Sequence, residues 1–203
     1  MINNKFTWSA AVIMSLLLIS SLAHAGTVDL PQTGQTKCYN TSGTEISCTD
    51  TGQDGDLRKG VEWPYPRFMN NGDGTVTDNL TGLIWTQNAG TPTVGSCAGG
   101  YKTWQGALDY VTCLNSMNYL GHSDWRLPNV NELESLINAD EPNSATWLTD
   151  QGFIGVQSFY SYWSSSSYAL NTVYAWFVYM WNGYVSYDDK SNGYYVWPVR
   201  SGQ

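Results

Sequence analysis

The chain is poor in basic residues and in histidine. Its 203 residues include nine Lys and Arg against 17 Asp and Glu, for a formal net charge of −8. Bulk charge therefore does not favour nucleic acid, anionic lipid or sulfated polysaccharide as partners. Of the two histidines, His24 lies near the N-terminus, which leaves His122 as the single candidate for histidine chemistry in the rest of the chain.

Catalytic motifs are also missing. The sequence holds no HExxH, GxSxG, P-loop or dinucleotide-binding pattern. Ser123 and Asp124 directly follow His122, and such neighbours cannot adopt the geometry of a catalytic relay. Glu132 and Glu134 are two residues apart and point to different faces of a helix. We therefore predict no catalytic residue, no cofactor and no enzyme activity.

Metal-ligand patterns are weak. No CxxC or Cys/His spacing indicates zinc. Asn71, Asp73 and Asp78 loosely resemble a calcium loop, but the terminal Glu of the twelve-residue pattern is absent. A hairpin turn rich in Asn, Asp and Gly accounts for the same residues. Residues 188–189 with Asn192 give a second weak possibility. We predict no metal site, with calcium binding as the open alternative.

Long apolar runs are confined to the N-terminus. Residues 10–22 are apolar, Lys5 precedes them, and Ala23-His24-Ala25 has the small-x-small pattern of a cleavage site. The run is shorter than the roughly 18 to 20 apolar residues that span a bilayer. We predict a signal peptide at residues 1–25, no membrane span, and export to the periplasm, the cell surface or the medium.

Cysteine is sparse, with four residues in the whole chain: Cys38, Cys48, Cys97 and Cys113. In an exported chain these are expected to form disulfides. Four cysteines allow three pairings, and the two local pairs, Cys38 with Cys48 and Cys97 with Cys113, are the ones we expect.

Hydrophobic periodicity predicts an α+β protein. Residues 26–63 are polar and read as an extended leading segment with a disulfide, followed by a domain over residues 64–203. Trp85, Trp104 and Trp125 are expected in the core. The expected helices cover residues 104–114 and 129–137, the expected strands cover 75–78, 83–86, 125–127, 161–167, 173–181, 184–187 and 194–200, and residues 139–159 and 188–193 are expected as loops.

Large aromatic side chains gather near the C-terminus. Residues 160–200 hold nine of the 14 tyrosines and four of the 10 tryptophans, separated by Ser, Asn, Asp and Gly. This mixture is typical of recognition surfaces, because Tyr and Trp give stiff contact area and the small polar residues give adaptable hydrogen bonds.

Strand alternation divides these rings into two sets. Tyr162, Trp163, Trp176 and residues 196–200 are expected to hold the fold. The others are expected to face a ligand. The predicted ligand-binding residues are Tyr174, Phe177, Tyr179, Trp181, Tyr184, Ser186, Tyr187, Asp188, Asp189, Ser191, Tyr194 and Tyr195. The alternative is that both faces of the strand over residues 173–181 are buried between layers.

Several motifs, in order, resemble a bacterial exported family, that of the C-terminal domain of collagen-like surface adhesins (the Lcl C-terminal domain). The resemblance covers about residues 67–200, and residues 37–63 also resemble the entry region common in the family. It implies a C-type-lectin-like fold, with short antiparallel sheets and two helices, over residues 64–203. The motifs are Asn71-Gly-Asp-Gly-Thr-Val-Thr-Asp-Asn-Leu-Thr-Gly-Leu-Ile-Trp85, Trp104 with Ala107-Leu108, Ser123-Asp-Trp-Arg-Leu-Pro-Asn-Val-Asn-Glu-Leu133, Tyr162-Trp-Ser-Ser165 and residues 196–200.

The resemblance implies a surface binding or adhesion module whose partner is a protein or glycan on another cell or surface. Some members of the family are variable proteins of diversity-generating retroelements, which rewrite adenines in a C-terminal coding segment. Many residues from 170 to 195 are of types reachable in this way from an Asn codon, although Trp181 is not. An enzyme of the formylglycine-generating branch of the fold and a structural envelope protein are the alternatives.

Overall fold

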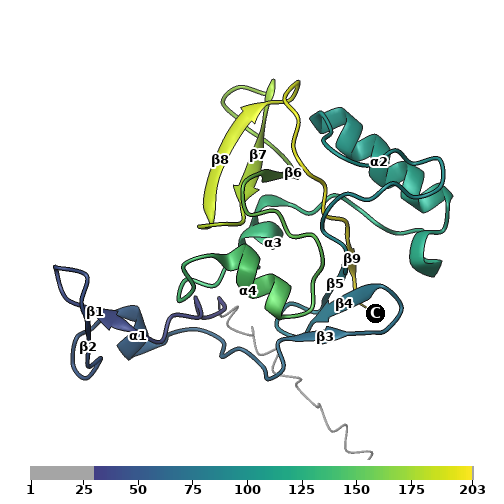
Figure 1. Ribbon diagram of the computed structural model, residues 1–203. Helices are drawn as coiled ribbons and strands as arrows, with labels where there is room; N and C mark the ends of the chain where they lie inside the picture. The colour runs from purple at the N-terminus through teal and green to yellow at the C-terminus, as the bar shows by residue number, and fades with distance from the viewer. Residues whose placement is uncertain (1–29, 203) are drawn as a thin grey trace, which may run out of the picture.

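The computed structural model describes residues 30–202 and contains, over that range, four α-helices and three small antiparallel sheets (Figure 1). The α+β class is confirmed, but two of the helices were not expected. The predicted signal peptide lies outside the described residues. The elements are β1 (Cys38–Tyr39), β2 (Glu45–Ile46), α1 (Asp54–Leu57), β3 (Phe68–Asn70), β4 (Thr75–Asp78), β5 (Leu83–Thr86), α2 (Trp104–Ser116), the 3-10 helix η1 (Tyr119–Gly121), α3 (Val130–Glu134), α4 (Ser144–Asp150), β6 (Ser161–Ser167), β7 (Tyr174–Tyr179), β8 (Tyr184–Asp189) and β9 (Val199–Ser201).

A four-stranded sheet, in the order β3-β4-β5-β9, brings the C-terminal strand β9 beside β5. The turn before β4 is built by side chains, since Asp73 Oδ1 accepts hydrogen bonds from the Thr75 N–H (2.9 Å) and Thr75 Oγ1 (2.6 Å). Over residues 30–202, no group of three His, Cys, Asp or Glu side chains gathers as metal ligands.

The last strand is shorter than expected. Only Val199–Ser201 forms β9, although a strand was predicted over residues 194–200. Tyr194 and Tyr195 instead form isolated bridges with Lys102 and Tyr162. Pro198 offers no N–H to a sheet, which accounts for the break before β9. The strand expected at residues 125–127 is likewise reduced to one bridge, between Arg126 and Val199.

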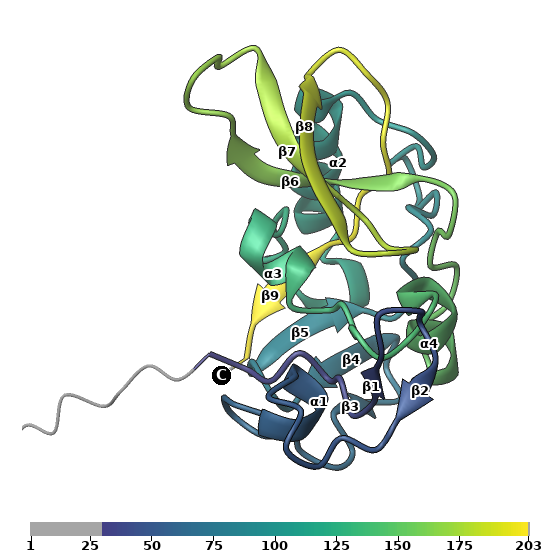
Figure 2. The same cartoon turned by 90° about the vertical axis from the view of Figure 1, so that its left-hand side faces the viewer.

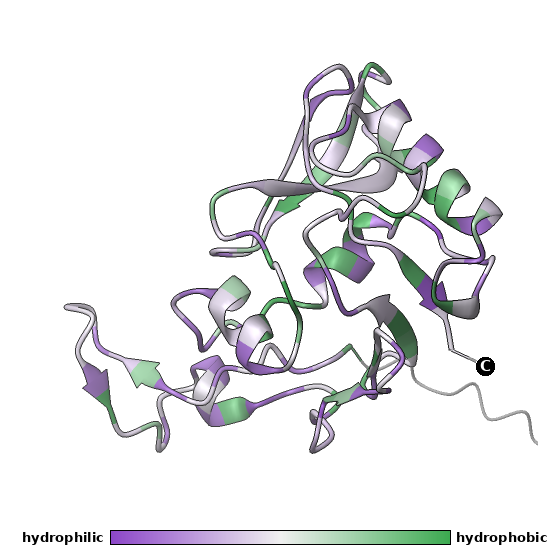
Figure 3. Ribbon diagram, turned by 45° about the vertical axis from the view of Figure 1, so that its right-hand side comes forward, coloured by the Kyte–Doolittle hydropathy of each residue, from purple (hydrophilic) through white to green (hydrophobic). Residues whose placement is uncertain are grey.

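The two expected helices begin where their caps predict, although α3 ends at Glu134 and is shorter than the expected range of 129–137. Thr103 caps α2, where its side chain accepts a hydrogen bond from the Gly106 N–H. Asn129 and Glu132 form the full capping box at the start of α3. Hydrophobic and hydrophilic residues alternate along α2 in Figure 3, which fits a helix with one buried face.

Helix α4 lies in the region expected to be a loop. Asn143 caps it by accepting a hydrogen bond from the Thr146 N–H (3.1 Å), and its own residues Ala145 and Leu148 are buried in the core. Seven residues make only two turns, so the apolar pattern is too short to identify the helix from sequence.

Two hydrophobic clusters form the core. The first lies between the four-stranded sheet and helices α3 and α4, and it includes Trp85 and Trp197. The second lies between α2 and the sheet β6-β7-β8, and it includes Trp125 and Trp163. Trp85 and Trp125 are buried as expected, whereas Trp104 is only half-buried at the edge of the second cluster and donates a hydrogen bond to the Ser164 carbonyl (2.8 Å).

Both local disulfides are present, Cys38–Cys48 and Cys97–Cys113, so the expected pairing is confirmed. The first closes the β1–β2 hairpin, which extends away from the rest of the protein in Figure 1 and lies in front of it in Figure 2. A hydrogen bond from Thr36 Oγ1 to Asp140 Oδ2 (2.6 Å) joins this leading segment to the domain.

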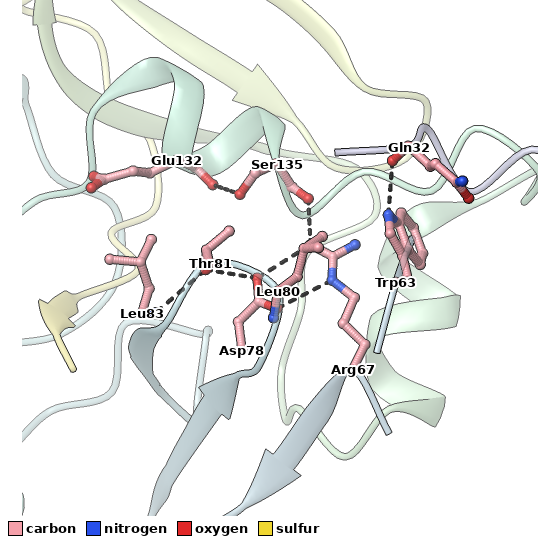
Figure 4. Close-up of polar contacts among 9 residues, drawn as sticks. All are labelled: Gln32, Trp63, Arg67, Asp78, Leu80, Thr81, Leu83, Glu132 and Ser135. Carbon is pink, nitrogen blue, oxygen red and sulfur yellow. Dashed lines mark hydrogen bonds and ion pairs between the residues drawn. The ribbon is translucent and has the colours of Figure 1, made fainter. Parts of the chain in front are cut away.

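A buried ion pair completes the attachment of the leading segment (Figure 4). Arg67 donates hydrogen bonds to both carboxylate oxygens of Asp78 (3.2 and 3.3 Å) and to the Ser135 carbonyl at the end of α3 (2.5 Å). Its guanidinium lies 4.2 Å from the ring centre of Trp63, whose indole N–H donates to the Gln32 carbonyl (2.7 Å). Burial lowers the pKa of Arg67.

Candidate functional site

The sheet β6-β7-β8 carries most of the predicted ligand-binding residues. Strand register decides which of them share a face, because directly paired residues point the same way. Phe177, Tyr179 and their partners Ser186 and Tyr184 point toward the side covered by α2. Tyr174, Trp176 and their partners Asp189 and Tyr187 point toward the opposite side, where α3 packs.

Both faces of β7 are partly covered, and this reverses two expectations. Phe177, expected to bind ligand, is buried against α2, whereas Trp176, expected in the core, is only half-buried. Helices α3 and α4 cover only the end of the other face, where Val178 and Met180 are fully buried. Trp176 lies beyond that cover, whereas Phe177 on the other face packs against the residues of α2.

The open end of this face holds four rings, Tyr168, Tyr174, Trp176 and Tyr187, which we call the outer cluster. Tyr168 and Tyr187 stack with ring centres 3.9 Å apart and planes 5° apart. The Trp176 ring stands nearly perpendicular to both, with centroids 5.5 and 5.7 Å away. These contacts hold the rings in place before any ligand arrives.

A second group lies where β7 turns into β8, and we call Tyr179, Trp181 and Tyr184 the turn cluster. Trp181 and Tyr184 are 46 % and 57 % exposed. Asn182 Oδ1 accepts a hydrogen bond from the Tyr184 N–H (3.1 Å), and Gly183 has a φ of +73°. The Asn-Gly pair therefore fixes the turn that presents these rings.

Two other predicted residues support the surface from within. Tyr194 donates a hydrogen bond to Asp188 Oδ2 (2.6 Å). Burial, together with the charge of Asp188, raises the pKa of Tyr194. Burial opposes ionisation of Asp188, but the hydrogen bonds from Tyr194 and the backbone outweigh it and lower the pKa of Asp188. Tyr194 and Asp188 thus bond to each other and hold the end of β8 in place, and we call them the bracing pair.

The remaining predicted residues lie around the end of β8. Asp189 is the last residue of the strand, and its Oδ1 accepts a hydrogen bond from the Ser191 N–H (2.9 Å). Tyr195 lies away from both clusters and contacts Tyr101 and Tyr160, with ring centres 4.7 and 5.8 Å apart. The predicted set therefore includes members of the outer cluster, the turn cluster, the bracing pair and this separate tyrosine group. Phe177 lies in the core instead, and Ser186, Asp189 and Ser191 belong to none of these groups.

Sequence reasoning missed Tyr168 and Lys190. Tyr168 begins the loop that joins β6 to β7, its N–H donates a hydrogen bond to the Tyr174 carbonyl (3.0 Å), and its ring stacks on Tyr187 of β8. Lys190 fastens that loop: its ammonium donates hydrogen bonds to Ser167 Oγ (2.7 Å) and the Thr172 carbonyl (3.0 Å), and it lies 4.0 Å from the ring centre of Trp104. One feature of the sequence could have pointed to Lys190: it is the single basic residue between residues 160 and 199.

A groove with a volume of about 560 Å³ adjoins the turn cluster, and we call it the turn groove. Asn182 and Gly183 form one wall, the α3 region forms another through Asn131, Glu134 and Ile137, and residues 30–33 of the leading segment form a third. It joins parts of the chain that are far apart in sequence, and no sequence pattern indicated it.

None of the helices in residues 30–202 combines the length and apolar character that a membrane crossing requires. A comparison with curated proteins gave no match to the chain. The family model of the Lcl C-terminal domain matches residues 74–200, a range that contains both aromatic clusters and excludes the leading segment. That range is more than half of the chain, and the chain therefore belongs to the Lcl C-terminal domain family.

Proposed function

We propose that this chain is an exported, non-enzymatic adhesion module that presents the sheet β6-β7-β8 to a protein or glycan on another cell or surface. The observation that carries the proposal is the exposure of Trp181, Tyr184 and Tyr187, at 46 %, 57 % and 43 %, in the turn between β7 and β8 and along β8. Large rings held at the surface by fixed turns bind with little loss of side-chain entropy. Membership of an adhesin-associated family and the two disulfides support an extracellular location.

The proposed fold is C-type-lectin-like. Its support is the family match together with the short antiparallel sheets, the capped helices and the two disulfides. Diversification by a retroelement is a further part of the proposal, supported by the placement of Tyr174, Tyr179, Tyr184 and Tyr187 on β7 and β8 with their rings at least partly exposed. Sequencing the neighbouring DNA tests it: a reverse transcriptase gene and a near-copy of the 3′ coding end, differing at adenines, are expected, and their absence rejects it.

The pairing of all four cysteines also supports a binding role over an enzyme of the formylglycine-generating branch, which relies on cysteine chemistry. Thiol titration of the unreduced, unfolded protein is expected to find no free thiol. One or more reactive thiols would restore the enzyme alternative.

The binding role is tested by alanine variants at Trp181, Tyr184 and Tyr187, screened against arrays of glycans and of extracellular proteins. We expect each variant to lose at least about tenfold in affinity, as interface anchors do, with little change in melting temperature. Tyr65→Ala is the matched control, because Tyr65 is a fully exposed ring outside the sheet. Equal binding by the control and the three variants would contradict the proposal.

A further inference from the structure

Strand β8 is an edge of its sheet. The order β6-β7-β8 gives it one partner, β7, and Figure 2 shows β8 running along the outside of the sheet. A strand edge of this kind is a template for pairing with another extended chain. β8 is six residues long, which is enough to hold a short peptide.

The direction of the backbone groups shows which residues are free to pair. The Lys190 N–H donates a hydrogen bond to the Val173 carbonyl (3.0 Å), which sets the alternation along β8. Even-numbered residues therefore bond to β7, whereas the N–H and C=O groups of Val185 and Tyr187 point outward. None of the turn, loop or side-chain hydrogen bonds of residues 30–202 involves these outward groups.

Side chains on both faces of β8 would flank an added strand. Tyr184 and Ser186 project on the α2 side and Tyr187 on the other, and all three retain some exposure. A neighbouring strand would place its alternate side chains against these residues in turn. A polypeptide would thus meet both the aromatic surface and the open backbone.

The turn groove adjoins the start of this strand edge and contains a negatively charged side chain. β8 begins at Tyr184, directly after Gly183 in the groove wall. Among the described residues that line the groove, Glu134, which is exposed, is the one with a charged side chain, and it lies beside apolar Leu30 and Ile137. The groove therefore suits a side chain with an aliphatic stem and a cationic end. The net charge of −8 favours the same kind of partner.

We propose that an extended, basic segment of a partner protein adds to β8 as a fourth strand and places a Lys or Arg side chain in the turn groove beside Glu134. This inference rests on the proposed function and narrows its ligand to a polypeptide. Recognition then has two parts: hydrogen bonds to the outward groups of Val185 and Tyr187, and an ion pair with Glu134.

The experiment is a selection from a displayed library of linear twelve-residue peptides on the folded protein, followed by synthesis of the enriched peptides. We expect Lys or Arg in the enriched sequences, and slower hydrogen exchange at the Val185 and Tyr187 amides when a peptide binds. N-methylation of alternate peptide amides should weaken binding at least about tenfold, because it removes donors to the strand edge.

Charge recognition is measured with Glu134→Gln, which should lower the affinity for the same peptides about tenfold, the size expected of one charged hydrogen bond. Glu141→Gln is the control with the same charge change on an exposed residue outside the groove, and it should bind like the wild type. Enrichment of peptides without basic residues, or unchanged exchange at both amides, overturns the inference. A failed peptide selection together with glycan binding that depends on Trp181 and Tyr184 overturns it while leaving the proposed function intact.

Discussion

The turn between β7 and β8 makes a sharp prediction for Gly183→Ala. Gly183 has a φ of +73°, and a Cβ added there would lie 2.8 Å from Cγ2 of Ile137 on the neighbouring α3 segment. Two separate penalties follow: a backbone conformation that L-residues rarely adopt, and a steric overlap inside the wall of the turn groove.

The two penalties have different sizes. A left-handed conformation costs an L-residue about 1 kcal/mol. Overpacking adds about 1 to 2 kcal/mol when the neighbour has to move. The total loss in unfolding free energy is therefore about 2 to 3 kcal/mol for Gly183→Ala. Gly72→Ala is the matched control, because Gly72 has a φ of +78° and no atom within 4 Å of the added Cβ. It should lose about 1 kcal/mol.

Urea unfolding of both variants measures the difference, and a double-mutant cycle identifies its source. Ile137→Ala removes the atoms that the new Cβ would meet, so it should recover about 1 to 2 kcal/mol in the Gly183→Ala background. Equal losses for Gly183→Ala and Gly72→Ala, or no coupling to Ile137→Ala, would show that the turn is not packed against α3 as described.

Three further predictions concern stability. Phe177→Ala should lose about 3 to 4 kcal/mol in urea unfolding, since it empties a core site, whereas Tyr184→Ala should lose less than about 1 kcal/mol; similar losses would mean that the two rings are equally buried. Replacing Cys97 and Cys113 by Ser should lose about 3 kcal/mol, the loop-closure value for a separation of 16 residues, and an unchanged denaturation midpoint would contradict it. A hydrogen bond from Arg200 lowers the pKa of Asp124, so the contribution of this ion pair to stability is complete above pH 4 and is lost as the pH falls through the lowered pKa. Asp124→Asn should therefore reduce the change in melting temperature between pH 4 and pH 2, and an unaltered pH dependence would refute the prediction.

Local chemistry made much of the fold predictable. The capping box of Asn129 and Glu132 marks the start of α3, and the Asn-Gly pair at Asn182 marks the hairpin turn, because each depends on residues close in sequence. The disulfides were predictable because both close short loops, of which Cys38–Cys48 is the shorter.

The distribution of rings between core and surface was not predictable in the same way. Alternation separates Trp176 from Phe177 but does not say which helix covers which end of a face. That depends on the packing of α2 and α3, whose positions are set by contacts far away in sequence. Tyr168 shows the same limit, since it lies outside the predicted strands and the pairing of β7 with both β6 and β8 brings its ring onto Tyr187.

The buried tryptophans that flank the proposed binding surface in the sequence have a practical consequence for engineering. The Trp163 indole N–H donates to the Lys102 carbonyl and the Trp197 indole N–H donates to the Thr86 carbonyl, both at 2.9 Å. Each end of the intervening segment is thus anchored to a part of the chain that precedes it. We therefore expect the exposed loop and strand positions between these anchors to accept substitutions for new specificities without loss of the scaffold.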